Sequence, residues 1–573
     1  MESLTVNDFS LELRQDEQWR QILHHISFTL KPGETVGIVG ESGSGKSVTA
    51  LSVMQLLNRN HTRYTSGSIV FHDQGRDINL LECDEKQMQN IRGNKIAMIF
   101  QEPMTSLNPV LKCGEQISEA ILLHTRMSKK ESRERVISLF KEVMLPRPEI
   151  IYDSYPHELS GGQKQRVMIA MAMSCNPNIL IADEPTTALD VTVQKNILDL
   201  ISKLQKKYGM SVVFITHDLG VVAEIAKKII VLYKGNIVET GAIEDIFSRP
   251  QHPYTQGLLA CRPPLDRRPK RLSTVDDYIQ HSLDSSKQNI DTELVSEEER
   301  QQFQKRLYAE KPLISISQLN KTYPIRKRKL FQKQEYVNAL QDISIDIYEG
   351  ETLGLVGESG CGKTTLGRSM IRLIEPSSGS VTYKGVNLTE LSRREMMKFR
   401  KDLQIILQDP YSSLNQHITI GAALMEPMQV HGLYNNDRER KNKAIALLER
   451  VSLDESHFYR YPHEFSGGQR QRISIARALA VDPRFIICDE SVSALDVSVQ
   501  AQVLNLLNEL KQEYHFTYIF ISHDLSVVKY MSNRMAVMQK GRIVEINDAD
   551  AIYSHPQTEY TRKLIDSIPK GIN

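Results

Sequence analysis

Two glycine-rich segments have the residue types and spacing that bind phosphate groups. The first reads GESGSGKS over Gly40–Ser47, and the second reads GESGCGKT over Gly357–Thr364. Both fit the pattern G-x-x-x-x-G-K-[ST], in which backbone N–H groups surround a polyphosphate, the lysine reaches its outer phosphates and the final hydroxyl holds Mg²⁺. The expected contacts are Gly40, Ser42, Gly43, Gly45, Lys46, Ser47, Gly357, Ser359, Gly360, Gly362, Lys363 and Thr364. Each loop follows an apolar run and precedes a helix-compatible segment, so we expect a strand, a glycine turn and a helix in both places.

Two pairs of adjacent acids follow predicted strands. Asp183 and Glu184 come directly after the apolar run Asn178–Ala182, and Asp489 and Glu490 occupy the corresponding place later in the chain. Adjacent acids are usually surface charge, but downstream of a phosphate loop and at the end of a strand they are suited to nucleotide chemistry. The aspartate can take Mg²⁺, and the glutamate can orient or deprotonate the attacking water.

Glutamine and histidine side chains also stand at predicted strand ends. Gln101 and Gln408 precede loops from which they can reach Mg²⁺ or the attacking water. His217 and His523 follow the next strands, where an imidazole can bond a γ-phosphate. Taken singly, each is more often structural. The expected catalytic residues are Gln101, Glu184, His217, Gln408, Glu490 and His523, and the expected Mg²⁺ ligands are Ser47, Gln101, Asp183, Thr364, Gln408 and Asp489.

A Ser-Gly-Gly turn opens a predicted helix in each half of the chain. The first lies in LSGGQKQR, Leu159–Arg166. Such a turn can be a simple helix N-cap, or an anion-binding nest of hydroxyl and backbone N–H groups. Since one phosphate loop already suffices for one nucleotide, a second anion-binding turn implies a nucleotide that is bound elsewhere. The expected contacts are Ser160, Gly161, Gly162, Gln163, Ser466, Gly467, Gly468 and Gln469.

These elements recur at a nearly fixed offset. Subtracting residue numbers gives 306 for Ser160 to Ser466, for Asp183 to Asp489 and for His217 to His523. The offset is 307 for the two glutamines and 317 for the two loop lysines, so the first half has about ten extra residues, which we expect in a surface loop around Asn58–Lys86. Five motifs in one order, twice, indicate an internal duplication.

Each half resembles an ATP-binding cassette, the nucleotide-binding domain of the cassette transporters. The resemblance implies an α/β fold with two P-loop NTPase domains in tandem, each with a RecA-like core, an antiparallel β subdomain and a helical subdomain. It also implies ATP and Mg²⁺ as cofactors and ATP hydrolysis as the activity. The expected domains are residues 1–261 and 312–573, joined by a polar linker over residues 262–311.

In that family two cassettes pair head to tail, and each ATP lies between the phosphate loop of one and the Ser-Gly-Gly turn of the other. The resemblance therefore implies pairing within this chain, with Lys46 opposite Ser466 and Lys363 opposite Ser160. Tyr323 is suited to stack on adenine in the second half. No adenine-stacking residue is assigned in the first half, and the sequence leaves open any asymmetry between the sites.

Four further segments resemble the oligopeptide and dipeptide import branch of the family, which includes glutathione and nickel importers. They are EPMTSLNP after Gln101, DPYSSLNQ after Gln408, HPYTQGLL over His252–Leu259 and HPQTEYTRKL over His555–Leu564. The resemblance implies two integral-membrane permeases as partners, an external substrate-binding protein, peptide as cargo and a peripheral position at the cytoplasmic face of the plasma membrane. The sequence does not identify the cargo.

Composition argues against other classes. The net charge of +1 gives no nucleic-acid footprint, six cysteines show no C-x-x-C pair, and no apolar run is long enough to cross a membrane. The alternative function is a soluble tandem-cassette ATPase that acts on ribosomes or nucleic acid, but the basic insert or zinc-binding cysteines of such proteins are missing. Residues 262–311 are polar and charged, which favours a solvated tether, although Ser296 and Glu299 form a possible capping box for a short helix.

Overall fold

The computed structural model describes residues 2–15, 17–73, 75–101, 106–186, 189–283, 293–324, 334–493 and 495–568. These residues form two compact units. The first contains the residues up to Leu259 together with residues 278–283, and the second contains Ala260–Asp277 and residues 293–568. Among the described helices, none has the length and apolar character needed to cross a membrane.

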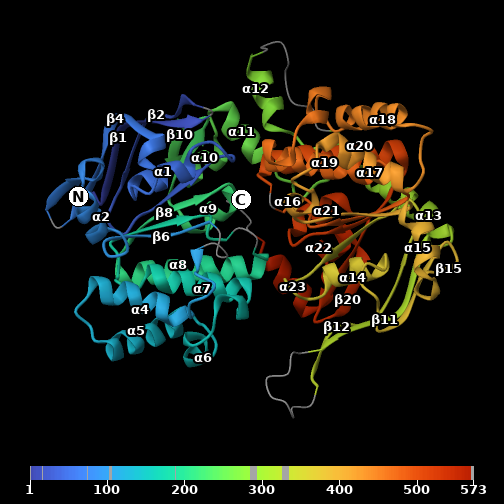
Figure 1. The fold of residues 1–573 in the computed structure, drawn as a ribbon, viewed down its shortest axis with the longest axis horizontal. Coiled ribbons are helices and arrows are strands. Elements are labelled where there is room, and N and C mark those ends of the chain that lie inside the picture. Colours follow the sequence, from blue (N-terminus) through green and yellow to red (C-terminus); the bar gives the residue numbers. More distant parts are fainter. Residues whose placement is uncertain are drawn as a thin grey trace. The chain divides into compact units, whose positions relative to one another are not determined.

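A six-stranded sheet with the order β10-β9-β3-β8-β7-β6 forms the centre of the first unit (Figure 1). Its strands are β3 (Thr35–Val39), β6 (Ile96–Ile99), β7 (Ile179–Asp183), β8 (Ser211–Thr216), β9 (Lys228–Tyr233) and β10 (Asn236–Ala242). All are parallel except β10. The strand β3 is buried at every position, which explains why its sequence is a continuous apolar run.

An antiparallel sheet with the order β2-β1-β4-β5 packs on this centre and shares one apolar core with it. Its strands are β1 (Leu4–Gln15), β2 (Gln18–Leu30), β4 (Thr62–Asp73) and β5 (Arg76–Asn79). The helices and 3₁₀ turns that accompany the two sheets of the first unit are α1 (Lys46–Val53), η1 (Arg59–His61), η2 (Leu80–Glu82), α2 (Glu85–Ile91), α8 (Val191–Tyr208), α9 (Leu219–Ile225), α10 (Ile243–Ser248) and α11 (Pro253–Ala260).

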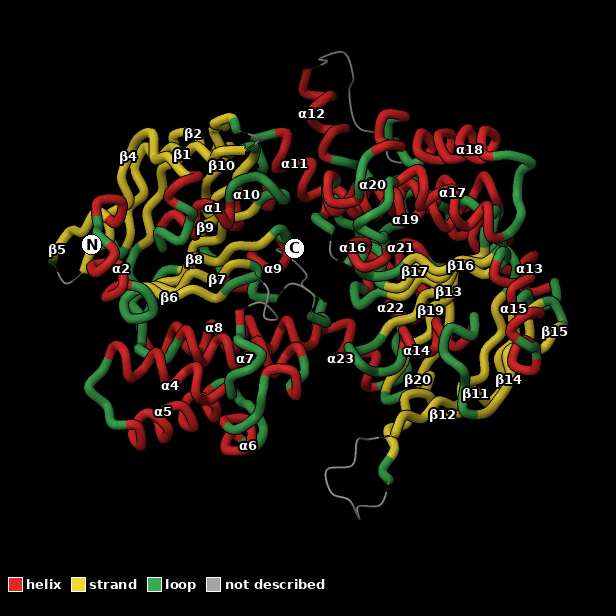
Figure 2. Tube along the Cα trace, in the orientation of Figure 1, coloured by secondary structure: helices red, strands yellow, loops and turns green. Residues whose placement is uncertain are grey.

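A group of helices forms the third part of the first unit and lies on the far side of the six-stranded sheet from β1, β2 and β4 (Figure 2). It contains α4 (Cys113–His124), α5 (Lys129–Glu142), α6 (Pro148–Tyr152), η3 (Pro156–Glu158) and α7 (Gly161–Ala172). The predicted division into a core, an antiparallel β subdomain and a helical subdomain is therefore confirmed for this unit.

The second unit repeats the strand order of the first: β20-β19-β13-β18-β17-β16 and β12-β11-β14-β15. Its strands are β11 (Ile314–Pro324), β12 (Tyr336–Ile347), β13 (Thr352–Val356), β14 (Ser378–Tyr383), β15 (Val386–Asn387), β16 (Leu403–Ile406), β17 (Phe485–Asp489), β18 (Thr517–Ile521), β19 (Arg534–Gln539) and β20 (Arg542–Asp548). The tandem α/β fold predicted from the duplication is confirmed.

The helices of the second unit follow the same plan. They are α13 (Glu297–Ala309), α14 (Lys363–Met370), η4 (Leu388–Glu390), α15 (Arg393–Arg400), α16 (Pro410–Ser413), α17 (Ile420–Val430), α18 (Asp437–Arg450), η5 (Glu455–Tyr459), η6 (Pro462–Glu464), α19 (Gly467–Leu479), α20 (Val497–Tyr514), α21 (Leu525–Met531), α22 (Ala549–Ser554) and α23 (Glu559–Asp566). Residues 262–311, between the cassettes, are called the interdomain segment. Its helix α12 (Val275–Leu283) contains residues assigned to both units.

Two sequence-based expectations need correction. The extra residues of the first half do not form a loop: β4 has 12 residues where β14 has 6, so part of the insertion lengthens the antiparallel sheet. The segment between the cassettes is not a free tether, because Ala260–Asp277 and residues 293–311 belong to the compact second unit. Ser296 caps α13 with the predicted capping box. Polar composition alone does not show that a segment will dock on a neighbouring surface.

Candidate functional site

The phosphate loops connect β3 to α1 and β13 to α14, as the sequence predicts. Gly45 and Gly362 cap the helices with φ of 105° and 112°, values that favour glycine. A Cβ at Gly45 would lie 2.5 Å from a methyl of Leu23, whereas a Cβ at Gly43 would meet nothing within 4 Å. The loop is therefore packed tightly on one side and open at Gly43, which suits a backbone cradle for phosphate.

Each loop lysine is buried and bridges its own loop. Lys46 Nζ donates to the carbonyl oxygens of Gly40 and Glu41, both at 2.8 Å. Lys363 makes the same pair of bonds in the second loop, at 2.7 and 2.9 Å. Neutral carbonyls are weak partners for a buried ammonium compared with a phosphate, so the lysine has a strong electrostatic preference for a polyanion in this loop.

A hydroxyl and a carboxylate meet beside each loop. Ser47 Oγ donates to Asp183 Oδ1 at 3.1 Å, and Thr364 Oγ1 donates to Asp489 Oδ1 at 2.9 Å. Burial raises the pKa of Asp183 to about 6, while the bond from Ser47 opposes this rise. Paired hard oxygens next to a phosphate site fit Mg²⁺, which binds through one or two protein oxygens together with phosphates and water.

In the first cassette the glutamine and the histidine both contact Glu184, the second acid of the pair. Gln101 Nε2 donates to Glu184 Oε2 at 3.0 Å, and His217 Nδ1 lies 3.3 Å from the same oxygen. Glu184 itself has φ of 47°, a left-handed conformation that costs a non-glycine residue about 1–3 kcal/mol, and Glu490 repeats it in the second cassette.

The second cassette repeats this cluster around Glu490, whose φ is 51°. Gln408 Nε2 donates to Glu490 Oε2 at 2.7 Å, and His523 Nδ1 lies 3.8 Å from it. Burial raises the pKa of Glu490, but His523 and Lys363 together lower it by more, so its pKa lies below the ordinary value. An ionised carboxylate at this position can orient a water molecule and accept its proton.

The Ser-Gly-Gly turns begin α7 and α19 with capping boxes. Gln163 N donates to Ser160 Oγ at 3.4 Å, and Ser160 N donates to Gln163 Oε1 at 3.0 Å. Ser466 and Gln469 form the same box. The N-cap interpretation of these turns is thus confirmed. It leaves Gly161 open, since a Cβ there would meet no atom within 4 Å.

Tyr323 is the last residue but one of β11 and is 38% exposed. The ammonium of Lys321 lies 5.0 Å from its ring centroid. In the corresponding part of the first cassette, Trp19 of β2 stacks with Arg63 of β4, whose guanidinium carbon lies 3.8 Å from the ring centroid. The four residues Glu102–Thr105, which begin the segment EPMTSLNP, lie outside the described part of the chain.

Two tyrosines that contact the phosphate loops had no role in the sequence analysis. Tyr254 OH accepts a hydrogen bond from Glu41 N at 2.9 Å, and Tyr560 OH accepts one from Glu358 N at 3.1 Å. Tyr254 is fully buried and stacks on Tyr233 with centroids 4.2 Å apart. Both tyrosines come from the C-terminal HPYT and HPQTEY segments, whose resemblance to a family was noted without a structural function.

The two sites also differ in one charge. Arg368 Nη2 lies 3.6 Å from Asp489 Oδ2 and lowers the pKa of that carboxyl against the larger effect of burial. The matching residue of the first cassette, 317 positions earlier, is Leu51. The sequence contained this difference, but only the fold places residue 368 against the acid.

The sequence pattern of the ABC transporter family matches residues 23–187 and 340–493, which cover both phosphate loops and both acidic pairs. The chain belongs to the ABC transporter family. A second pattern, the C-terminal region of oligopeptide/dipeptide transporters, matches residues 238–282 and 544–571.

Several relatives align along nearly the whole chain. The glutathione import ATP-binding protein GsiA of Escherichia coli O157:H7 is 47% identical over 572 residues, covering 99% of this chain and 89% of the relative. The protein of the same name from Pectobacterium atrosepticum is 45% identical over 571 residues, with 98% and 89% covered. A solved dimeric ATP-binding cassette with ADP and phosphate is 27% identical, covers 41% of this chain and 98% of its own, and has a TM-score of 0.38.

These matches confirm the predicted family, its oligopeptide/dipeptide branch and the tandem cassettes. The chain binds and hydrolyses ATP as ABC cassettes do, and a membrane permease is the partner class that follows from the family. They favour transport over the alternative function on ribosomes or nucleic acid.

Proposed function

We propose that this chain is the energy-coupling ATPase of a peptide importer, and that it works through two composite sites in which each cassette closes on the nucleotide held by the other. The observation that carries the proposal is that both cassettes hold the lysine within its own phosphate loop, the loop hydroxyl on the aspartate, and the glutamine and histidine against the glutamate. The match of both C-terminal segments to oligopeptide/dipeptide transporters supports the transport role.

The residues divide the work as follows. Lys46 and Lys363 hold the outer phosphates, and the paired oxygens of Ser47 with Asp183 and of Thr364 with Asp489 hold Mg²⁺. When bound, that ion neutralises phosphate charge and aligns the leaving group.

Glu184 and Glu490 orient the attacking water and accept its proton. His217 and His523 lie against these carboxylates, and a ring N–H of each histidine can donate to the γ-phosphate. Gln101 and Gln408 bond the same carboxylates and so connect them to the loops that follow the two glutamines. The Ser160 and Ser466 turns supply N–H groups to the nucleotide of the opposite cassette. Tyr323 packs on the adenine of the second site.

Cargo, further partners and location belong to the same proposal. Relatives at 45–47% identity are named glutathione import proteins, which supports a small peptide such as glutathione as cargo. We infer two permease subunits, an external substrate-binding protein and a peripheral position at the cytoplasmic face of the membrane. The domain boundaries proposed for the cassettes are residues 1–261 and 312–573.

The catalytic assignment is tested by Glu184→Gln and Glu490→Gln. Each change keeps the shape of the side chain and removes the base, so ATP binding should persist while hydrolysis falls by about 10²–10⁴ at that site. Steady-state ATPase activity of the single and double variants is measured beside ATP binding. A double variant that turns over at the wild-type rate would contradict the assignment.

The cargo is tested with the assembled importer. The chain is co-purified with its permeases from detergent-solubilised membranes, reconstituted in vesicles, and its ATPase rate is measured with the external binding protein loaded with glutathione, a longer peptide or Ni²⁺. Stimulation by glutathione or by the peptide supports the proposal, while stimulation by Ni²⁺ alone, or co-purification of ribosomes instead of permeases, contradicts it.

A further inference from the structure

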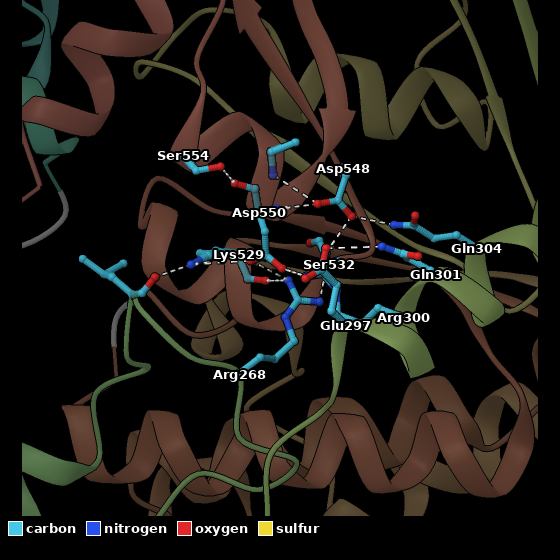
Figure 3. Close-up of polar contacts among 12 residues, drawn as sticks. Arg268, Glu297, Arg300, Gln301, Gln304, Lys529, Ser532, Asp548, Asp550 and Ser554 are labelled. Carbon is cyan, nitrogen blue, oxygen red and sulfur yellow. Dashed lines mark hydrogen bonds and ion pairs between the residues drawn. The ribbon is translucent and has the colours of Figure 1, made fainter.

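The interdomain segment is anchored to the second cassette by charged contacts (Figure 3). Arg268 donates to the carbonyl oxygens of Ser532, at 3.0 Å, and Lys529. Arg300, on α13, pairs with Asp548 at 2.6 Å and also with Asp550. These contacts fix the segment against α21, the end of β20 and the start of α22.

A cavity of 610 Å³ lies between this segment and the cassette surface. Its volume is within the range of small-molecule sites, which is about 300–1,000 Å³. Apolar and aromatic side chains form part of the lining, and the rest combines basic side chains with neutral polar ones such as Gln302, Asn508 and Asn533. The lining residues used below are Arg268, Lys270, Glu299, Arg300, Phe303, Arg306, Lys511, Phe516 and Tyr530.

The charges around this cavity are unbalanced. Five of the lining side chains are cations, Arg268, Lys270, Arg300, Arg306 and Lys511, whereas Glu299 is the single carboxylate among them. Lys270 is paired with Glu293 at 2.5 Å and lies 3.6 Å from Glu299. Arg300 is paired with Asp548 and Asp550. The carboxylates near the cavity therefore balance part of the positive charge of its lining but not all of it.

Two lining cations have no carboxylate within ion-pair distance among the described residues, namely the partly buried Lys511 and the exposed Arg306. Lys511 Nζ donates only to neutral oxygens, Thr352 Oγ1 at 2.7 Å and Asn533 Oδ1 at 3.3 Å. Burial lowers the pKa of Lys511 to about 8, against a smaller opposing effect of Glu351. The ammonium of this partly buried lysine lies 5.8 Å from the ring centroid of Phe303, and an anion beside it would balance its charge.

Arg268 adds an unused donor. Its side chain is only 12% exposed, and its buried Nε has no hydrogen-bond partner among the described residues, whereas its other two nitrogens are bonded. Buried guanidinium donors are normally satisfied, so this atom is a further vacancy for an acceptor.

The internal duplication shows that ATP chemistry does not explain these residues. With the offset of 306, Lys511, Lys529 and Tyr530 correspond to Gln205, Ala223 and Glu224. Gln205 Nε2 donates to Thr35 Oγ1 at 2.8 Å, the bond that Lys511 makes to Thr352. The first cassette keeps the same fold and the same ATP cluster with an amide here, so neither the fold nor the ATP chemistry requires Lys511.

We propose that this cavity binds a small organic anion with a ring-sized apolar body, its charged group held by Lys511 and Arg306 and its body packed on Phe303, Phe516 and Tyr530. Charge alone would suit inorganic phosphate, but an aromatic lining adds stabilisation only for a ligand that has apolar surface. This ligand is distinct from ATP and from the transported cargo, since the cavity lies within the second unit and its lining includes none of the phosphate-loop residues.

The probe is pyridoxine 5′-phosphate, an aromatic anion, titrated by calorimetry into the full chain with Glu184→Gln and Glu490→Gln. Mg²⁺ and two equivalents of ATP per chain fill the nucleotide sites, so that there is little hydrolysis heat and no excess ATP to compete. One molecule should bind per chain, and neutral pyridoxine should bind at least about tenfold more weakly because it lacks the charge. Lys511→Gln and Arg306→Ala should each weaken binding by about tenfold, whereas Lys563→Gln, which removes a 73% exposed cation outside the cavity, should not.

Lys511→Gln installs the residue that the first cassette uses at this position, so the fold and the ATPase rate should be retained. A second measurement maps the site directly: the aldehyde of pyridoxal 5′-phosphate condenses with an unprotonated lysine amine, releasing water, and borohydride reduces the imine to a stable amine. Peptide mass spectrometry should find the reduced adduct on Lys511, and pyridoxine 5′-phosphate added in excess should prevent its formation. The proposal is overturned if Lys511 is not labelled, if pyridoxine competes equally well, or if the cavity variants bind like the wild type.

Discussion

At the scale of single residues, the phosphate loops depend on side chains from distant parts of the chain. Tyr254 and Tyr560 each accept one loop N–H, although they follow their loops by about 200 residues. Each phenol accepts a hydrogen bond from the residue that follows the first glycine of its loop. The C-terminal segments of the two cassettes therefore help to hold the phosphate loops in the shape that binds phosphate.

Removing these hydroxyls should weaken ATP binding. Tyr254→Phe leaves the N–H of Glu41 without its partner, a loss of about 1 kcal/mol, or about fivefold in Kd for ATP at the first site. Tyr560→Phe should act equally on the second site. ATP affinity is measured with nucleotide binding at the opposite site removed by Lys363→Ala or Lys46→Ala, and Tyr233→Phe is the control because it touches the same ring stack without bonding the loop. Unchanged Kd values in both variants would show that the tyrosines are only packing.

Cys361 gives a prediction for pH. Its thiol is 7% exposed, and burial raises its pKa above the ordinary value, against smaller opposing effects that include Lys363. A raised pKa means less thiolate at neutral pH, so alkylation by iodoacetamide should be slower than for a free thiol at pH 7.5 and should rise as the pH passes 9.

Bound ATP should slow this alkylation further. Mass spectrometry of the second loop measures it, and Cys361→Ser, which copies Ser44 of the first loop, should keep ATPase activity. Labelling at pH 7.5 as fast as for a small free thiol would contradict the burial of this side chain.

At the scale of elements, helices pack against the central strands through glycine. A Cβ at Gly37 in β3 would lie 2.6 Å from a methyl of Val222 in α9, and one at Gly354 in β13 would lie 2.3 Å from Val528 in α21. The helices α9 and α21 begin two residues after His217 and His523, so close packing of strand and helix positions these histidines.

Gly37→Ala should therefore destabilise the first cassette by about 1–3 kcal/mol through overpacking. The single tryptophan, Trp19, lies in β2 of the first unit, and its fluorescence reports unfolding of that unit. The denaturation midpoint should fall for Gly37→Ala but not for Gly354→Ala, which affects the other unit, nor for Gly241→Ala, whose Cβ would have ordinary contacts. Equal midpoints for all three would contradict the packing argument.

Sequence patterns predicted the elements that carry their own local signals. The glycine loops, the acids after Asp183 and Asp489 and the capped Ser-Gly-Gly helices are coded within a few residues, and the duplication checked each of them twice. The docked interdomain segment, the Tyr254 contact and the approach of Arg368 to Asp489 could not be predicted in this way. Each depends on a partner far along the chain, and nothing in the local composition identifies that partner.

At the scale of the whole molecule, the duplication has produced two cassettes with one ATP chemistry and different surroundings. The second cassette has Arg368 near Asp489, Cys361 in its loop and a docked interdomain segment, none of which has a counterpart among the described residues of the first. We expect the sites to share a mechanism and to differ in rate.

The most direct measurement is a structure of the Glu184→Gln, Glu490→Gln variant with ATP bound, determined by electron cryomicroscopy. Our account predicts that the Ser160 turn contacts the γ-phosphate of the ATP held by Lys363, and that the Ser466 turn contacts the ATP held by Lys46. An ATP-loaded structure in which both turns remain away from both nucleotides would contradict it.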